Sequence, residues 1–485
     1  GSTSTERQAY QQHFIDLCHL VGHPTPAELD PENKFFTFEA GAAKLGGGNG
    51  FADVWFKGHF AIEYKGPDGS LTKAYTQLLQ YRESLENPLL LIVSNIQTLS
   101  IHTNFPNCAN VTIPVSLDDL LTPQGLKLIR DIFNNPEAFR PEKTAAQVTE
   151  EAAEQFGRLA MHLTKWGYSP HDIAHYLIRL LFCLFSEDIN LLPAGLFTRM
   201  VENGRRNVTV FNRQVKLLFQ AMAEGDSFGE HQIRYFDGGL FDDDSVLDMD
   251  SQGLAILHGI TQLDWSAIEP AILGTLFVRS LDPSKRAQLG AHYTSKEDIL
   301  LIVEPVLMAP LRREWEAIKN QARELAAKRD AAPTKAVATR IQNELRALVM
   351  SFAQKIRSIR VLDAACGSAN FLYISLRLLM DLEKEVSNFC GEIGLQPFFP
   401  EVSPAQLYGI EINDYAHELA QATVWIGYLQ WLHENGYGFP SEPILQPLHN
   451  IKHMDAILAY DEQGRPVEPE WPEADVIVGN PPFLG

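Results

Sequence analysis

Two acidic residues and a lysine near the N-terminus have the types and spacing that phosphodiester hydrolysis requires. Asp53 lies in the apolar segment FADVWF, and Glu63 and Lys65 end the next segment, HFAIEYK. The turn between these segments predicts a β-hairpin, in which Glu63 and Lys65 share a face and Asp53 can lie beside them. Two carboxylates can bind Mg²⁺, and an adjacent lysine can orient or help to deprotonate a metal-bound water. The three residues are a candidate nuclease site, with an ordinary ion pair as the alternative.

A second chemically suited set lies near the other end of the chain, where the apolar segment ADVIVG is followed by Asn480, Pro481, Pro482 and Phe483. The side-chain oxygen of Asn480 and the backbone carbonyl of Pro481 can accept the two hydrogens of an exocyclic base amine. This frees the nitrogen lone pair to attack a methyl sulfonium. The prolines restrict the backbone so that the oxygens converge, and Phe483 offers a face for a flipped base. In other contexts the same residues form an ordinary turn.

Three further strand-like segments end in residues that suit a nucleoside cofactor. Gly367 permits close approach of the backbone, and Asp363 at the preceding strand end can accept hydrogen bonds from an amino group. Glu411 can bind two ribose hydroxyls, and Asp455 can accept a hydrogen bond from an adenine edge. The turn lacks the glycine spacing of dinucleotide and phosphate-binding loops, which disfavours NAD and ATP. Cys366 in the same turn is expected to be a buried thiol rather than a nucleophile.

Hydrophobic patterning divides the chain into the regions that must position these residues. Residues 1–145 alternate apolar and polar positions between turns, which predicts a mixed α/β domain. Residues 146–265 carry apolar residues at three- and four-residue spacing, which predicts a helical connector. Residues 266–485 return to strands followed by polar turns, as at the ligand-binding edge of an open α/β sheet. We therefore expect an α/β multidomain protein.

Charge is distributed unevenly along the sequence. The formal net charge of -21 argues against binding nucleic acid through overall electrostatics. Residues 311–360, which predict two helices broken near Ala331 to Pro333, nevertheless hold 12 Lys and Arg against 5 Asp and Glu. A solvated helical face is the ordinary explanation. An arm that contacts phosphates is the alternative.

Composition excludes several classes of protein. The five cysteines are widely spread, without a CxxC pair or a Cys/His cluster at zinc spacing, so neither a disulfide framework nor a structural zinc site is indicated. No apolar run approaches the roughly 20 residues of a membrane span, and the polar N-terminus lacks the features of a signal peptide. A cytoplasmic protein without membrane contact fits best.

The motifs and their order resemble a known family. The segment FADVWFKGHFAIEYKG followed by QLLQYRE is similar to PD-(D/E)xK nucleases, and GAHYTS, DAACGSANF, GIEIN and NPPF are similar to gamma-class DNA adenine-N6 methyltransferases. Together they resemble MmeI-like type IIL enzymes, a branch of the type IIG restriction–modification enzymes. The resemblance implies a prokaryotic enzyme that acts on double-stranded DNA with Mg²⁺ and S-adenosyl-L-methionine. Its expected activities are endonuclease cleavage and adenine-N6 methylation, which cleave foreign DNA and protect the host's own.

The resemblance also implies roles for individual residues. Asp53 and Glu63 are the expected metal ligands, and Lys65 is the expected catalytic lysine. The expected cofactor-binding residues are Tyr293, Thr294, Asp363, Cys366, Gly367, Glu411 and Asp455, and the target base is expected at Asn480, Pro481, Pro482 and Phe483. Three alanines depart from the family motifs: Ala52 and Ala364 replace prolines, and Ala369 replaces a glycine.

Two other functions stay open at this point. One is a phage-defence adenine methyltransferase whose nuclease-like domain is a non-cleaving arm, and the other is a non-catalytic subunit that senses DNA or the cofactor. The presence of both residue sets argues against an inert domain. Because the sequence stops two residues after Phe483, the resemblance predicts further methyltransferase strands and a target-recognition domain in a longer protein. Residues 266–485 are then the N-terminal part of the methyltransferase domain.

Overall fold

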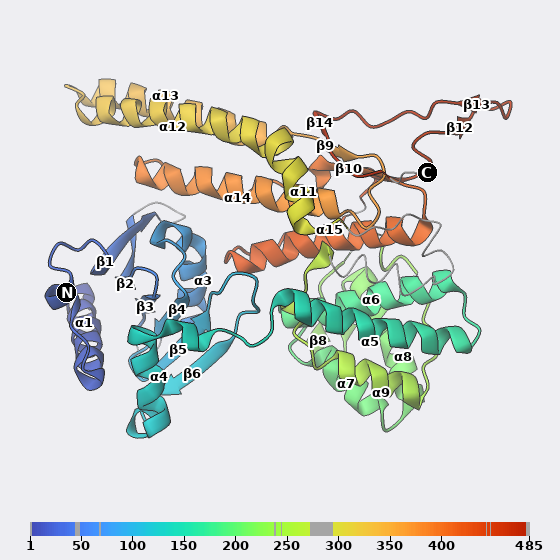
Figure 1. Cartoon of the computed structure of the whole chain (residues 1–485), viewed down its shortest axis with the longest axis horizontal. Helices are drawn as coiled ribbons and strands as arrows, with labels where there is room; N and C mark the ends of the chain where they lie inside the picture. Colours follow the sequence, from blue (N-terminus) through green and yellow to red (C-terminus); the bar gives the residue numbers. More distant parts are fainter. Residues whose placement is uncertain are drawn as a thin grey trace.

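The computed structural model describes residues 2–43, 49–66, 69–236, 239–243, 245–271, 294–442, 444–446 and 448–481. Figure 1 shows a sheet domain at the N-terminus, a helical part that follows it, and a third part whose long helices lie above both. No helix within these described ranges is long and apolar enough to cross a membrane. The predicted α/β multidomain fold is confirmed, with a mixed sheet, a helical spacer and a parallel sheet in that order.

The N-terminal domain is built around a six-stranded mixed sheet with its strands in sequence order. The strands are β1 (Phe36–Ala43), β2 (Asn49–Phe56), β3 (Phe60–Tyr64), β4 (Leu90–Ser94), β5 (Thr98–Thr103) and β6 (Thr112–Ser116). All neighbours are antiparallel except β3 and β4. A parallel pair needs a crossover, and α3 (Leu71–Tyr81) provides it.

Both faces of this sheet are covered, which explains why β3 and β4 are buried at every position. One face packs aromatic residues against α1 (Ser2–Val21) and α4 (Pro123–Asn134), where Phe14 and Phe133 contact Phe60. The short α2 (Pro26–Leu29) precedes β1. The opposite face packs Trp55 and Val93 against the apolar side of α3. The domain therefore has two cores of its own.

The spacer is helical, as its three- and four-residue spacing predicts. It consists of α5 (Ala145–Lys165), α6 (Pro170–Asp188), α7 (Leu196–Gly204), α8 (Val208–Glu224) and α9 (Ser251–Ile260), with a small hairpin of β7 (Ser227–Phe228) and β8 (His231–Gln232). Helix α6 is buried on all sides along most of its length, as expected for a helix that is apolar all round. It is the central helix of the spacer.

The third part contains a parallel sheet in the order β11-β10-β9-β14. Its strands are β9 (Val361–Asp363), β10 (Leu407–Glu411), β11 (Ile451–His453) and β14 (Val476–Ile477), and β12 (Ala459–Tyr460) and β13 (Pro466–Val467) form a separate hairpin. The helices are α11 (Lys296–Val303), α12 (Ala309–Asp330), α13 (Lys335–Ser358), α14 (Asn370–Glu392) and α15 (Asp414–Glu434). A single hydrophobic core runs from the spacer into this sheet, so these two parts pack as one unit.

Candidate active sites

The first candidate site lies where β2 and β3 pair. Val54 pairs with Ile62 in antiparallel register, which puts Asp53 and Glu63 at the next position along the two strands. The Oδ2 atom of Asp53 accepts a hydrogen bond from the backbone N–H of Tyr64 at 2.6 Å. The predicted hairpin thus brings Asp53 next to the Glu63 strand end.

Helix α3 completes a closed network around Glu63, whose residue exposure is only 4%. The Oε1 atom of Glu63 accepts hydrogen bonds from Lys65 Nζ and Gln77 Nε2, both at 2.8 Å. Lys65 also donates to Gln77 Oε1 at 3.2 Å. The hydroxyl of Tyr81 contacts Gln77 at 3.1 Å and Glu63 Oε2 at 3.3 Å. Because Gln77 and Tyr81 are four residues apart on one helix, α3 presents both to the carboxylate.

The donor atoms of this site suit a hard cation but are few. Carboxylate oxygens are the ligands that Mg²⁺ prefers, and it commonly uses one or two of them together with water or substrate phosphate. In the described part of the chain no three His, Cys, Asp or Glu side chains are grouped so as to hold a metal ion. Asp53 and Glu63 are therefore compatible with Mg²⁺ binding that leaves other coordination positions to water and substrate.

The second candidate site lies at the carboxyl ends of β9 and β10, where backbone groups organise the loop. Glu411 Oε2 accepts a hydrogen bond from Gly367 N at 2.8 Å, and Glu411 Oε1 accepts one from Asn413 N at 2.8 Å. The N–H of Cys366 donates to the carbonyl of Ile410 at 3.0 Å. The first turn and the second strand end are thus joined through a carboxylate.

Asp363 lies beneath this turn and is 1% exposed. Its Oδ1 accepts a hydrogen bond from Ala365 N at 3.1 Å. Burial, with a smaller contribution from the charge of Glu411, raises the pKa of Asp363 to about 7, although the bond from Ala365 opposes the shift. A Cβ atom at Gly479 would lie 2.4 Å from the same carboxylate oxygen. The segment before Asn480 therefore packs directly on Asp363.

The predicted base-binding residue Asn480 contacts the upstream segment. Its Nδ2 donates to Thr294 Oγ1 at 3.3 Å across 186 positions of sequence. Pro481 is exposed, and Tyr293, Pro482 and Phe483 lie outside the described residues. Asp455 follows β11, and its Oδ1 accepts hydrogen bonds from the N–H groups of Ile457 and Leu458.

The turn leaves room for a ligand. Gly367 has a φ of +54°, and a Cβ built on it meets nothing within 4 Å. Ile412, directly after Glu411, is 60% exposed although it is apolar. A nucleoside cofactor that lies between them would use the free space at Gly367 and cover Ile412. Burial raises the pKa of the Cys366 thiol well above its usual range, in agreement with the expected buried thiol.

The nuclease-like helix α3 is also in contact with the methyltransferase-like part, which sequence patterning did not predict. Lys384 on α14, with a 3% exposed side chain, pairs with Glu83 at 2.5 Å and donates to the carbonyl of Leu79 at 3.2 Å. Gln80 donates to the carbonyl of Gly436 at 2.8 Å. Although burial opposes ionisation, the charges of Lys384 and Arg82 lower the pKa of Glu83. The helix that holds Glu63 is thus held from behind by another domain.

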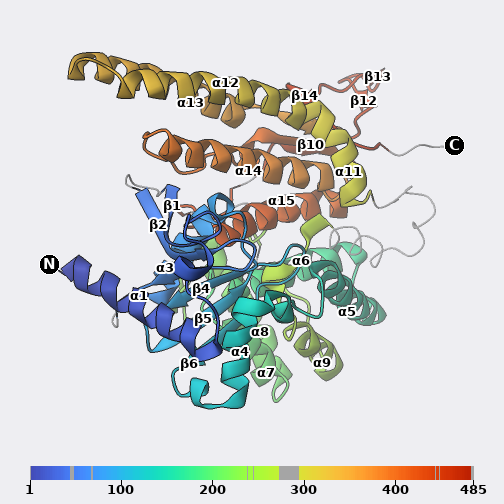
Figure 2. The same ribbon diagram turned by 60° about the vertical axis from the view of Figure 1, so that its left-hand side comes forward.

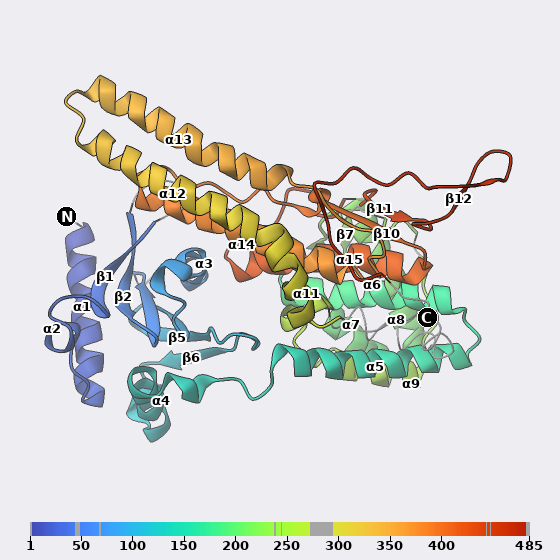
Figure 3. The same cartoon turned by 45° about the horizontal axis from the view of Figure 1, so that its top comes forward.

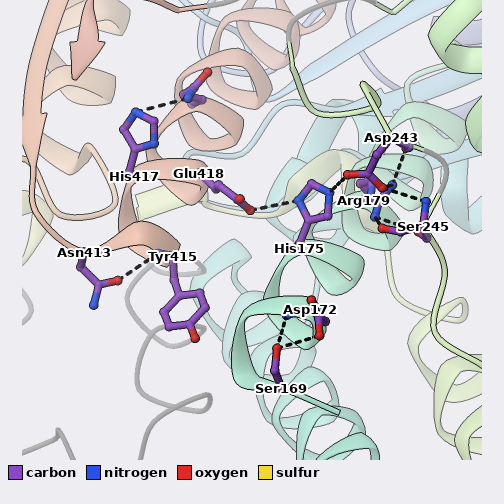
Figure 4. Close-up of polar contacts among 11 residues, drawn as sticks. Ser169, Asp172, His175, Arg179, Asp243, Ser245, Asn413, Tyr415, His417 and Glu418 are labelled. Carbon is purple, nitrogen blue, oxygen red and sulfur yellow. Dashed lines mark hydrogen bonds and ion pairs between the residues drawn. The ribbon is translucent and has the colours of Figure 1, made fainter. Parts of the chain in front are cut away.

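The spacer meets α15 through a histidine between two carboxylates, shown in Figure 4. His175 on α6 contacts Glu418 on α15 at 3.1 Å through Nδ1 and Asp243 at 3.0 Å through Nε2. Partial burial opposes ionisation of Asp243, but hydrogen bonds from Ser245 and the charges of Arg179 and His175 lower its pKa to about 2. This contact anchors the helix that follows Glu411. The sequence of α6 carries no signal for this contact, because the partners of His175 are far away in the chain.

The chain joins a mixed-sheet domain to a parallel-sheet domain through helices, and the parallel sheet carries an open turn at Gly367. Residues 1–165 match the family described as the MmeI N-terminal domain, residues 171–241 the MmeI helicase spacer domain, and residues 337–485 the MmeI DNA-methyltransferase domain. The three matches occur in the order of the three parts of the structure.

Two relatives give the extent of the similarity. A DNA methyltransferase A of Bacillus subtilis (strain 168) is 27% identical over 452 residues, which cover 89% of this chain and 46% of the relative. The solved structure of the type IIL restriction-modification enzyme MmeI in complex with DNA is 28% identical with a TM-score of 0.53, over 63% of this chain and 40% of that one. The chain therefore spans less than half the length of these relatives.

The chain belongs to the MmeI-like type IIL restriction–modification proteins, with their N-terminal, helicase spacer and methyltransferase domains. The resemblance that the motifs indicated is confirmed. The methyltransferase domain implies S-adenosyl-L-methionine as its cofactor, and the space beside Gly367 is compatible with that group.

Proposed function

We propose that the chain carries both activities of a bifunctional restriction–modification enzyme, a Mg²⁺-dependent DNA endonuclease and an S-adenosyl-L-methionine-dependent adenine-N6 DNA methyltransferase. We assign the nuclease to residues 1–145, the connector to 146–265 and the methyltransferase to 266–485. The observation that carries the proposal is the network of Lys65, Glu63, Gln77 and Tyr81 beside Asp53, in a chain with an MmeI-like methyltransferase domain. Its substrate is double-stranded DNA.

In the nuclease, Asp53 and Glu63 would hold Mg²⁺, and the chemistry that the cation would supply is polarisation of a phosphoryl oxygen and of a bound water. Gln77 and Tyr81 hold the Glu63 carboxylate in place. Lys65, at 2.8 Å from Glu63, is close enough to orient the attacking water or to stabilise developing negative charge. The carboxylate therefore serves two neighbours, the cation and the lysine.

In the methyltransferase, Glu411 would bind the ribose hydroxyls, Asp455 the adenine edge, and the turn at Asp363, Cys366 and Gly367 the methionine end, with Tyr293 and Thr294 closing over it. S-adenosyl-L-methionine supplies an electrophilic methyl group. Asn480 and the carbonyl of Pro481 would accept hydrogen bonds from the target amine, and Pro482 and Phe483 would shape the pocket and stack on the flipped base.

Cleavage of duplex DNA in Mg²⁺ and S-adenosyl-L-methionine tests the nuclease proposal. Lys65→Ala should lower the cleavage rate by about 100-fold or more, which is the usual scale for a group that assists proton transfer. Lys57→Ala is the matched control, because Lys57 lies on the same hairpin in an exposed pair with Glu86. Equal rates for the two variants would refute the assignment of Lys65.

Calorimetric titration with S-adenosyl-L-methionine tests the methyltransferase separately. Glu411→Ala should weaken binding, whereas Asn480→Ala should retain binding and lose transfer of labelled methyl groups to duplex DNA. A well-folded wild-type chain that binds no cofactor would contradict the proposal.

One observation favours the alternative of an adenine methyltransferase with a non-cleaving nuclease-like arm. Within the described ranges, two carboxylates rather than three ligand side chains are available for a metal, and Lys65 is engaged by Glu63 and Gln77. Methylation without any Lys65-dependent cleavage would support that alternative.

A further inference from the structure

Helices α12 and α13 form an antiparallel arm that runs out along α14 from the parallel sheet. The views in Figures 1 and 2 show the arm at the upper edge of the molecule, and Figure 3 shows its tip above the side that carries the N-terminal domain. The helices join at residues 331–334, where α12 ends at Asp330 and α13 begins at Lys335.

The arm is held against α14 near its base and against the end of that helix near its tip. Near its base, Trp315 stacks on Phe352 with ring centroids 5.2 Å apart and contacts Phe389 of α14 edge-on. Near its tip, Arg329 donates to the carbonyl of Ile393 at 2.6 Å and to Gln342 at 2.8 Å. The side chains on its outer surface are therefore presented from a fixed backbone.

The charge of this arm is not neutralised internally. Three of its acidic residues, Glu314, Glu316 and Asp330, pair with basic residues of the arm itself. Six exposed basic residues take part in none of the ion pairs found among the described residues: Arg313, Arg323, Lys328, Lys335, Arg340 and Arg346. The other two acidic residues of the arm, Glu324 and Glu344, also take part in none of these ion pairs, so the unpaired side chains of the arm carry six positive and two negative charges.

The net charge of residues 311–360 is opposite in sign to that of the rest of the protein. Residues 311–360 hold 12 of the 40 Lys and Arg and 5 of the 61 Asp and Glu, which leaves 28 basic and 56 acidic residues elsewhere. An ordinary solvated face in this chain would follow the acidic average. A basic surface that persists in an acidic protein is complementary to a polyanion.

A cleft of mixed charge lies between the arm and the N-terminal domain. Lys319 and Arg323 of α12 line this cleft of about 520 Å³ together with Arg82 from the sheet domain. Its other charged lining residues are Arg377, Lys384, Glu83, Asp381, Glu385 and Glu392, of which Glu83 and Glu385 are in ion pairs with lysines. From Arg313 to Lys328 the helix rises about 22 Å at 1.5 Å per residue, which matches about six phosphates of one DNA strand.

We propose that the α12–α13 arm is a sequence-independent contact surface for the phosphate backbone of duplex DNA, centred on Lys328, Lys335 and Arg340 near its tip. The inference rests on the proposed function, which makes DNA the substrate, and it adds a place where the chain holds that substrate. Lysine and arginine bind phosphates through charge and hydrogen bonds without reading the base sequence.

The salt dependence of binding to a 30-base-pair duplex tests the arm. In the full chain, the triple variant Lys328→Gln, Lys335→Gln, Arg340→Gln should lower the slope of log affinity against log salt concentration by about 2 to 3, since each phosphate contact contributes about 0.9. The control is Arg205→Gln, Arg206→Gln, Arg213→Gln, which removes the same charge from exposed positions of the spacer. The control should leave the slope nearly unchanged.

Equal slopes for the two triple variants would overturn the proposal. The proposal would also be overturned if polyglutamate of matched charge bound to the arm with the same affinity as the duplex and displaced it. Such a result would mean that the surface suits acidic protein segments equally well. The result is independent of catalysis. If the chain neither cleaves nor methylates DNA but the triple variant lowers the slope, the phosphate-contact proposal stands and the proposed activities are refuted. If the chain is active but the triple variant leaves the slope unchanged, only the phosphate-contact proposal is refuted.

Discussion

The two candidate sites are organised in different ways. In the nuclease-like site, side chains hold side chains: Glu63 accepts from Lys65, Gln77 and Tyr81, which come from a strand and a helix. In the methyltransferase-like site, the carboxylates of Asp363 and Glu411 accept from backbone N–H groups, both of their own turns and, for Glu411, of the turn after β9. The first arrangement depends on residue identity at several positions, and the second depends on backbone conformation.

This difference determines which substitutions each site tolerates. In the turn after β9, Ala364 and Ala369 stand where the family motif often has proline and glycine, and the hydrogen bonds that organise the turn come from backbone N–H groups that any non-proline residue provides. The Glu63 network does not tolerate substitution in this way, because loss of one side-chain partner leaves buried polar atoms without a hydrogen bond. It also depends on α3, which is fixed partly by Lys384 of another domain.

The largest expected effect concerns the buried charge of the turn, at Asp363→Asn. The pKa of Asp363 is about 7 in the folded chain. Between about pH 4 and 7, Asp363 is therefore protonated in the folded state and ionised in the unfolded state. The unfolded state then binds fewer protons, so the stability of the wild type falls as pH rises through this window. Asparagine still accepts from Ala365 N and does not titrate. Urea unfolding should show the variant more stable at pH 8 by up to about 4 kcal/mol, the equivalent of the full shift.

Unfolding at pH 4 is the internal control for that variant, because the folded wild type is uncharged at this position there and the loss of stability with rising pH has only begun. A wild-type and a variant protein with the same dependence of unfolding free energy on pH would show that Asp363 is ionised in the folded state.

The next effect tests whether the side-chain network depends on its neighbour domain. Lys384→Met removes the buried ammonium that holds Glu83 and the carbonyl of Leu79. We expect a loss of about 2 to 3 kcal/mol, below the usual value for breaking a buried pair because Glu83 is partly exposed. Hydrogen exchange in α3 should accelerate and cleavage should fall, while cofactor binding measured by calorimetry stays as in the wild type.

Lys384→Arg should restore part of the protection of α3, and Lys57→Met, on the exposed surface, should change none of these quantities. If Lys384→Met left the hydrogen-exchange protection of α3 unchanged, the contacts within the N-terminal domain would be sufficient to stabilise α3.

The smallest effect concerns the backbone of the turn. Ala369 has a φ of +65°, in the left-handed region that alanine adopts at a cost of about 1 kcal/mol. Ala369→Gly relieves this strain, but it makes the unfolded chain more flexible and removes a methyl group that is 0% exposed. Each of these terms is about 1 kcal/mol, so the stability in thermal unfolding should change by no more than about 1 kcal/mol. A loss of more than about 2 kcal/mol would contradict the strain. Gly367→Ala, at +54°, should lower the unfolding midpoint.

The sequence predicted what local patterns determine. Alternation and turn residues predicted the hairpin that brings Asp53 to Glu63, the helical spacer and the strand-end turns, and the break between α12 and α13 fell where Ala331 to Pro333 indicated it. Contacts between distant segments were not predictable. Lys384 and Glu83 are separated by most of the chain, and nothing in either segment specifies the other. The roles of the individual site residues stay predictions.

Gly436 gives the contact between the N-terminal domain and the methyltransferase domain a consequence for engineering. It has a φ of +68°, and a Cβ there would lie 2.4 Å from the carbonyl oxygen of Thr76 on α3. A chimera that takes its N-terminal domain from one relative and its methyltransferase from another must therefore keep glycine at this position and match the end of α3 to α14. Exchanging the N-terminal domain alone would replace one side of this close-packed contact and leave the other side unchanged.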